Sequence, residues 1–326
     1  MAGPDPDIDP ETDPGRWGHS LANLAEVLLP CLEAAEVRSI VELGAYAGDL
    51  TAVLADWAAA AGARVTAVDP FPEQRLAELA TERPNVDLVR ETSIAALPAL
   101  ARADAVIIDG DHNYFTVSEE LRLIDAGDGD LPLVLLHDVC WPHGRRDDYY
   151  DPDQIPAEHR QPIAEGGGLF PGEPGITPGA LPYRAAAARE GGARNGVLTA
   201  VEDFMSGRED LQLAVIPAFF GLGVLWPRGA PWADAVAAVV APWDHNPLLA
   251  RLERNRVFHL ASAQMSLAEA AIARQRAGRR EAMLRRLLDS SAFAVAERLS
   301  RLRVRLGVAT EHVEISKEQI RRALSE

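Results

Sequence analysis

Apolar and polar positions follow a regular order through the first 138 residues of the chain. Short apolar runs that end in polar residues predict strands, and apolar residues three and four positions apart predict helices. The predicted strands are RSIVELG (38–44), RVTAVDP (64–70), VDLVRE (86–91), DAVIIDGD (104–111) and LPLVLLHD (131–138). The predicted helices are 21–35, 49–62, 72–83, the short IAALPALA (94–101) and 116–126. This alternation predicts parallel βαβ units.

The predicted strands are almost wholly apolar, which is typical of a sheet covered by helices on both faces. We therefore expect a doubly wound α/β sheet. Ligands of such sheets bind at the carboxyl ends of the strands. Each predicted strand has a polar residue at or near that end: Glu42, Asp69, Glu91, Asp109 and Asp138.

The rest of the chain divides into three further parts. Residues 139–195 are rich in Gly, Pro, Arg and Tyr and lack regular periodicity, which predicts a lid or substrate loop. A helix (196–206) and two apolar runs (211–218 and 220–227) follow, and the runs are too close together for a crossover, so we expect them to pair antiparallel. We expect one domain over 16–228, which includes this loop, and a helical extension over 229–326.

Composition narrows the function classes. The net charge of −17 argues against nucleic-acid binding. The acidic, proline-rich residues 1–15 predict a disordered tail and no signal peptide, and no apolar run is long enough to span a bilayer, so we expect a cytoplasmic protein without a membrane partner. Residues 251–326 hold 16 Lys and Arg against 9 Asp and Glu. This segment is interpreted as a helical cap or homodimerisation element, or alternatively as a basic patch for an acidic partner.

The stretch VELGAYAGDL (41–50) combines a strand end, a glycine turn and a helix start. Gly44 permits the tight turn, and Gly48 lets the backbone approach a ligand closely. The pattern lacks the three glycines of the dinucleotide fingerprint, which disfavours a nicotinamide oxidoreductase. Asp69, at the end of the second strand, can accept hydrogen bonds from both ribose hydroxyls of a nucleoside.

The fourth and fifth strands should be neighbours, which would place Asp109, His137 and Asp138 side by side. Such a cluster can hold a divalent cation, which would act as a Lewis acid on a bound hydroxyl. His112 lies three residues beyond Asp109, and imidazole has a pKa that suits a general base. The alternatives are a hydrogen-bonding role for His137 beside the site and an ordinary surface position for His112.

These motifs resemble the class I S-adenosylmethionine-dependent methyltransferases. DGDHNY (109–114), the HD pair after the fifth strand and the helix GVLTAVEDF resemble the metal-dependent O-methyltransferases of natural-product tailoring, of the macrocin and mycinamicin type, over about residues 36–228. The resemblance implies a Rossmann-like sheet of seven strands with an antiparallel last strand, a His base at His112 and a cation held by Asp109, His137 and Asp138. The family has two acids where this chain has His137–Asp138, and imidazole favours Mn, Fe or Zn over Mg.

The donor-binding residues that follow from the motifs and the resemblance are Glu42, Gly44, Ala45, Tyr46, Gly48, Asp69, Pro70, Thr92, Ser93, Asp109 and Asp111. Arginine forks and tyrosine rings in the loop after the fifth strand suggest contacts to the acceptor: His143, Arg145, Arg146, Tyr149 and Tyr150. The leading hypothesis is an O-methyltransferase acting on a sugar or phenol hydroxyl of a small secondary metabolite. The alternative is a non-catalytic nucleoside-binding protein with a regulatory or scaffolding role.

Overall fold

A seven-stranded sheet forms the centre of the chain in the computed structural model, which describes residues 19–127, 129–164, 166–308 and 320–322. The predicted tail over residues 1–15 therefore lies outside the described residues. The strands are β1 Ser39–Leu43, β2 Arg64–Val68, β3 Val86–Val89, β4 Ala105–Ile108, β5 Leu133–His137, β8 Leu211–Ile216 and β9 Leu222–Pro227. Each strand lies within a segment predicted from the sequence.

The helices also follow the predicted segments. They are α2 Ala25–Ala34, α3 Asp49–Ala61, α4 Gln74–Glu82, α5 Ser93–Ala96, α6 Tyr114–Asp125, α7 Val197–Met205, α8 Ala233–Val240, α9 Pro247–Asp289 and α10 Ser291–Arg305. Helix α3 ends at Gly62, whose left-handed backbone is the usual helix stop. Helix α6 begins two residues before its predicted start, because the Asn113 side chain caps it by accepting a hydrogen bond from Thr116 N at 2.9 Å.

The strand order is β3-β2-β1-β4-β5-β9-β8. Strands β1 to β5 are parallel, whereas β9 runs antiparallel to both of its neighbours, β5 and β8. This confirms the doubly wound Rossmann-like sheet with an antiparallel last strand. The chain progresses from β1 in one direction to β2 and in the other to β4, so the order reverses at β1, where open α/β sheets bind their ligands.

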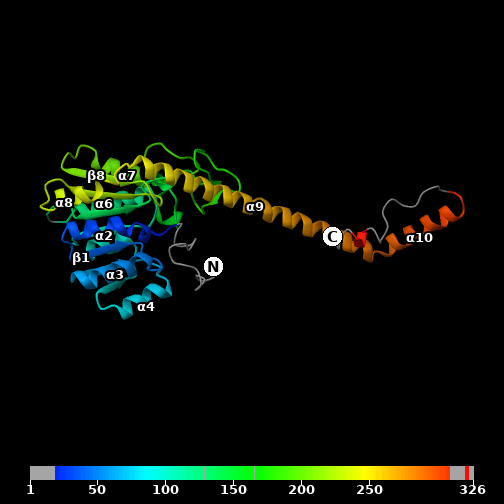
Figure 1. Cartoon of the computed structure of the whole chain (residues 1–326), viewed down its shortest axis with the longest axis horizontal. Coiled ribbons are helices and arrows are strands. Elements are labelled where there is room, and N and C mark those ends of the chain that lie inside the picture. The colour runs from blue at the N-terminus through cyan, green and yellow to red at the C-terminus, as the bar shows by residue number, and fades with distance from the viewer. Residues whose placement is uncertain (1–18, 128, 165, 309–319, 323–326) are drawn as a thin grey trace. The chain divides into compact units, whose positions relative to one another are not determined.

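Helices cover both faces of the sheet (Figure 1). Leu28 of α2, Leu54 of α3 and Val236 of α8 belong to one apolar core with the residues of the facing strands. Leu121 of α6 and Val201 of α7 belong to a second core on the opposite face. Burial on both faces explains why the strand sequences are almost wholly apolar.

By its contacts the chain divides into two compact units, Met1–Ser262 and Ala263–Glu326. The first unit thus continues past residue 228, where the sequence placed its end, because α8 packs against α2 and completes the core. The described part of the second unit is helical, through the end of α9 and α10. Among the described residues, no helix has the length and apolar character needed to cross a bilayer. The homodimer expected from these helices stays a prediction.

Residues 139–195 form an insert between β5 and α7. The insert contains short 3-10 turns and the two-stranded sheet of β6 Gly168–Leu169 and β7 Leu181–Pro182. Tyr149, Ile155 and Ala185 give the insert a small apolar core of its own. The predicted irregularity is present, but the segment is packed and not structureless.

Candidate functional site

The carboxyl ends of β2, β1, β4 and β5 lie next to one another at one edge of the sheet, because these parallel strands are consecutive neighbours. They carry Asp69, Glu42, Asp109 and Asp138. The electrostatics agree with this placement, since the charges of Asp109 and Asp69 both act on Glu42 and raise its pKa, although less than its burial does. The ends of these strands therefore lie together at one edge of the sheet, and the crevice that the sequence predicts there stays a prediction.

The turn after β1 needs its first glycine. Gly44 has a φ of +88°, and a Cβ at this position would overlap the backbone of Asp109 and Gly110. Its freedom thus lets the β1 and β4 loops pass in direct contact. Gly48, with a φ of +80°, is the residue before α3, and a Cβ there would meet the Leu76 side chain at 3.2 Å. Gly48 therefore faces a neighbouring helix and not open space.

Asp69 organises the two loops that border the donor side of the crevice. Its Oδ2 accepts the backbone N–H of Tyr46 at 2.8 Å, and its Oδ1 accepts that of Phe71 at 2.7 Å. The carboxylate is almost fully buried. Each carboxylate oxygen can accept more than one hydrogen bond, so Asp69 can also receive ribose hydroxyls. Ala45, Tyr46 and Pro70 lie in the same two loops.

Glu42 lies below the crevice and not in it. Its side chain is 2% exposed and accepts a hydrogen bond from Thr51 Oγ1 at 2.7 Å. Burial raises the pKa of Glu42 to about 8, and the Thr51 hydrogen bond offsets only part of this. The carboxyl group is therefore mostly neutral at pH 7. Through its hydrogen bond to Thr51, Glu42 supports the turn after β1. A neutral carboxyl group would pair only weakly with a charged group of the methyl donor.

The loop after β3 starts a short helix. The Thr92 hydroxyl caps α5 by accepting a hydrogen bond from Ala95 N at 3.4 Å. Ser93 is the first residue of α5. The Thr92 side chain thus has a local structural role, while Ser93 is half-buried.

Asp109, His137 and Asp138 form a tight cluster, as predicted. His137 Nδ1 lies 2.9 Å from Asp109 Oδ1 and 3.2 Å from Asp138 Oδ2. His137 Nε2 donates to the Phe219 carbonyl at 2.9 Å, which places the second nitrogen toward the two carboxylates. A bare lone pair facing two anions would be repelled, so a positive charge belongs at this point. Candidate ligand atoms of the three residues lie within 4.8 Å of one another.

Asp109, His137 and Asp138 fit a divalent cation, because His137 directs one ring nitrogen toward the two carboxylates. A metal-binding imidazole usually donates its other N–H to a carbonyl, as His137 does to Phe219. In the absence of a cation the same position takes a proton. Burial alone would lower the pKa of His137, but Asp138 and Asp109 outweigh burial and raise it well above its ordinary value.

Asp138 also holds the predicted base. Its Oδ2 lies 3.0 Å from His112 Nδ1, and Tyr150 Oη lies 2.9 Å from His112 Nε2. The backbone of Asp138 has a φ of +60°, a left-handed conformation that is unusual for a residue other than glycine. Burial would raise the pKa of Asp138, but His137 and His112 outweigh it and hold that pKa well below its ordinary range. His112 is thus a packed and oriented group, unlike an ordinary surface histidine.

Part of the insert surrounds His112. The His143 ring stacks on the His112 ring with centroids 4.8 Å apart, and the Tyr183 ring meets His143 edge-on at 5.0 Å. Asp148 N donates to the His112 carbonyl at 3.0 Å. The predicted substrate residues His143 and Tyr150 therefore do lie beside the predicted base.

Three other predicted acceptor residues make contacts within the protein, and their contacts to an acceptor stay a prediction. Both terminal nitrogens of Arg145 bind the Glu202 carboxylate of α7, at 2.6 and 2.7 Å. Arg146 is buried and donates to the carbonyls of Ala187 and Pro174. The Tyr149 hydroxyl donates to Asp147 at 2.8 Å, and its ring lies in the core of the insert. These contacts hold the insert together, although Arg146 Nε is buried without a hydrogen-bond partner among the described residues.

Asp111 ties the insert to the β4 loop, and its predicted contact to the donor stays a prediction. Its Oδ1 accepts Tyr150 N at 3.1 Å, and its Oδ2 accepts Asn113 Nδ2 at 2.5 Å and Thr116 Oγ1 at 3.2 Å. This carboxylate helps to position Tyr150 over His112.

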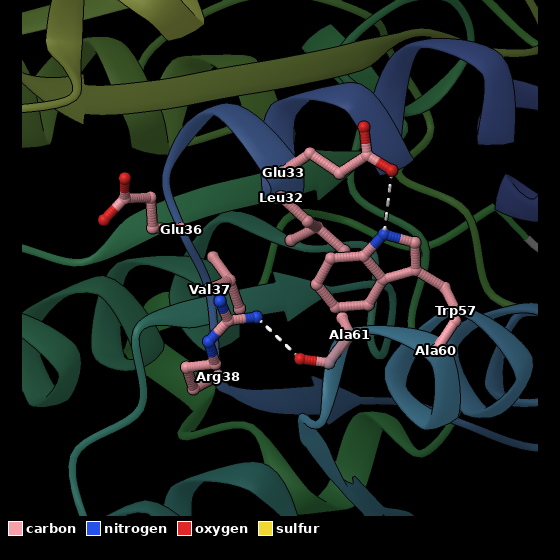
Figure 2. Close-up of a pocket in the computed structure, with 8 residues that line it drawn as sticks. All are labelled: Leu32, Glu33, Glu36, Val37, Arg38, Trp57, Ala60 and Ala61. Carbon is pink, nitrogen blue, oxygen red and sulfur yellow. Dashed lines mark hydrogen bonds between the residues drawn. The ribbon is translucent and has the colours of Figure 1, made fainter.

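Figure 2 shows a different cleft, of about 440 Å³, at the amino end of β1. Its polar groups are paired within the protein: Trp57 Nε1 donates to Glu33 at 3.4 Å, and Arg38 donates to the Ala61 carbonyl at 2.7 Å. It lies at the end of β1 opposite to Glu42 and takes no part in the crevice at the strand carboxyl ends.

Sequence reasoning missed Asp148 and Tyr183, which lie beside His112 and His143. Asp148 is 8% exposed, and its Oδ1 is buried without a hydrogen-bond partner among the described residues. The pair of acids in RRDDYY (145–150) was the available signal, because two carboxylates amid buried aromatic residues need partners.

Residues 41–139 match a family model described as a methyltransferase domain. No curated protein matches the chain. Three similar solved structures are distant in sequence and fit only loosely. The first is a Podospora anserina methyltransferase bound to S-adenosylhomocysteine, with 13% identity, coverage of 62% of this chain and 77% of that chain, and a TM-score of 0.37. The second is a putative caffeoyl-CoA O-methyltransferase from Staphylococcus aureus, with 13% identity, coverage of 63% of this chain and 82% of that chain, and a TM-score of 0.38. The third is the O-methyltransferase TomG from Streptomyces achromogenes, with 17% identity, coverage of 64% of this chain and 81% of that chain, and a TM-score of 0.38.

Proposed function

We propose that this chain, whose residues 41–139 match a methyltransferase-domain model, is an S-adenosylmethionine-dependent methyltransferase that methylates a hydroxyl group of a small secondary metabolite, a sugar or a phenol. The observation that carries the proposal is the arrangement of His112 between Asp138 and Tyr150. The resemblance of the sequence to the macrocin-type enzymes supports the same reaction. The macrocin-type assignment itself stays a prediction.

His112 has the geometry of a general base. Asp138 accepts the Nδ1–H of His112, which leaves the Nε2 lone pair directed at the Tyr150 hydroxyl. The Tyr150 hydroxyl thus marks where an acceptor hydroxyl would meet the base. Asp138 also stabilises the imidazolium that forms when Nε2 takes a proton, as in other carboxylate–histidine pairs.

The reaction is a displacement at the methyl carbon of the sulfonium. The acceptor oxygen gives its proton to His112 Nε2 and forms the new C–O bond. The C–S bond breaks at the same time, its electron pair stays on sulfur, and S-adenosylhomocysteine is released. In this proposal, Asp69 receives the ribose hydroxyls, and the backbone of Ala45 and Tyr46 borders the donor.

A divalent cation would be held by Asp109, His137 and Asp138. When bound, it supplies a Lewis acid that lowers the pKa of the acceptor hydroxyl. With an imidazole among three ligands, we expect Mn, Fe or Zn to bind in preference to Mg.

The test uses His112→Ala together with the matched variant His259→Ala, an exposed histidine of α9. Methyl transfer from labelled S-adenosylmethionine to a panel of sugars and phenols is measured beside the affinity for S-adenosylhomocysteine. Loss of a general base lowers turnover by about 10²–10⁴-fold, with donor affinity retained. The control should keep wild-type turnover. Donor binding without any methyl transfer by the wild-type protein would favour the alternative, a non-catalytic nucleoside-binding protein.

A further inference from the structure

The insert places a second, unused polar atom beside the base. Asp148 is 8% exposed, and its Oδ1 has no hydrogen-bond partner among the described residues. The backbone N–H of Ala185 supports the same carboxylate. A buried carboxylate oxygen without a donor is costly, and such an atom is usually satisfied by a ligand or an ordered water.

Asp148 belongs to the immediate surroundings of His112. Its backbone N–H donates to the His112 carbonyl at 3.0 Å. Burial raises the pKa of Asp148 to about 6, and the charge of His112 opposes this rise. Burial and the charges of Asp138 and Asp148 also raise the pKa of Tyr183. Asp148 is therefore bound to His112 through its backbone, and its charge acts on both His112 and Tyr183.

The charges around this space indicate what kind of acceptor it takes. Arg145 and Arg146 are bound to protein groups, and Arg256 is held by two contacts of 2.7 Å to Glu253. Asp148 Oδ1 is thus an unpaired hydrogen-bond acceptor, and among the described residues His143 Nδ1 and Arg146 Nε are buried nitrogens that also have no partner. The Asp148 carboxylate would repel an anionic group of the acceptor molecule, whereas a hydroxyl group can donate to it.

We propose that Asp148 Oδ1 accepts a hydrogen bond from a second hydroxyl of the acceptor, close to the hydroxyl that His112 deprotonates. Asp148 is then a specificity residue that selects polyhydroxylated acceptors over monohydroxylated ones. His143 and Tyr183 supply flat walls on which the acceptor ring lies. This assignment rests on the proposed function.

The experiment compares matched probes that differ by one hydroxyl: catechol with phenol, and methyl β-D-glucopyranoside with its 2-deoxy analogue. kcat/KM for methyl transfer is measured for the wild type, for Asp148→Asn and for Asp153→Asn. Asp153 is the matched control, because it lies in the same insert with its side chain 95% exposed. The affinity for S-adenosylhomocysteine is measured for each variant as a check of folding.

The wild type should prefer the probe with the second hydroxyl by about 10-fold or more in at least one pair. Asp148→Asn should reduce that preference below about 3-fold, and Asp153→Asn should keep it. If Asp148→Asn fails to fold, Asp148→Ala is measured in its place and should lose the preference in the same way. Transfer without preference in the wild type, or a preference that survives in Asp148→Asn, overturns the assignment and leaves the proposed function intact. Donor binding with no transfer to any probe overturns both.

Discussion

The neutral state of Glu42 gives a sharp prediction for the floor of the donor site. The protein holds the pKa of this carboxyl at about 8, against an ordinary value of 4.5. The folded state therefore binds a proton that the unfolded state releases between these two pH values. By linkage, the free energy of unfolding falls as pH rises through this window.

The magnitude follows from the size of the pKa difference. Each pH unit between the two pKa values is worth about 1.4 kcal/mol, so at pH 7 Glu42 costs about 3 kcal/mol relative to a carboxyl that titrates normally. Glu42→Gln keeps the shape and an oxygen for the Thr51 hydroxyl, and it removes the titration. We expect the variant to gain stability over the wild type by about 1.4 kcal/mol per pH unit from pH 5 to 8, and the gain to level off above pH 8.

The assay is urea unfolding of wild type and Glu42→Gln at pH 5, 6, 7 and 8. Glu202→Gln is the control, because Arg145 lowers the pKa of Glu202 at a more exposed position, so its stability difference should not grow with pH in this window. Binding of S-adenosylhomocysteine to Glu42→Gln should be close to that of the wild type. A stability difference that is flat from pH 5 to 8 would show that Glu42 is ionised in the fold and would refute this reasoning.

Three further predictions concern the crevice. Asp69→Asn replaces a charged acceptor by a neutral one and should weaken S-adenosylhomocysteine binding by about 10–100-fold in calorimetry, and an unchanged affinity would exclude the ribose contact. Gly44→Ala should lower the free energy of unfolding by about 1–3 kcal/mol in urea titrations, since its positive φ and its contact with the β4 loop leave no room for Cβ, and a neutral result would refute the contact. Wild-type protein should bind Mn²⁺ more tightly than Mg²⁺ in calorimetry, and His137→Glu should move this preference toward Mg²⁺, whereas equal selectivity of the two proteins would exclude His137 as a ligand.

The fold was predictable because its signals are local. Apolar runs such as AVII of β4 identify strands without reference to the rest of the chain, and Gly62 identifies the end of α3. Strand neighbourhood followed from the βαβ alternation, so the cluster of Asp109, His137 and Asp138 was within reach of the sequence. The sequence did not indicate that the first compact unit extends to Ser262. The packing of α8 against α2 joins the residues after 228 to this unit, and that contact cannot be recognised from the sequence alone.

The roles of the insert residues could not be predicted, because residue type does not show which partner a side chain finds. Arg146 looks like an anion-binding residue in sequence, but its donors bind the carbonyls of Ala187 and Pro174. Tyr149 and Tyr150 are adjacent and of the same type, yet one lies in the core of the insert and the other meets His112. Such assignments depend on contacts between residues 28 to 41 positions apart in the sequence.

The site is organised around one oxygen of Asp138, which His112 and His137 share. Asp138 Oδ2 lies 3.0 Å from His112 Nδ1 and 3.2 Å from His137 Nδ1. The orientation of the base and the positive charge in the acidic cluster are therefore set by the same carboxylate. The left-handed backbone of Asp138 turns the chain out of β5 at this point, a conformation that costs energy and persists because both imidazoles hold the side chain. Any change at His137 should consequently affect His112, even though His137 ends β5 and His112 lies in the loop after β4.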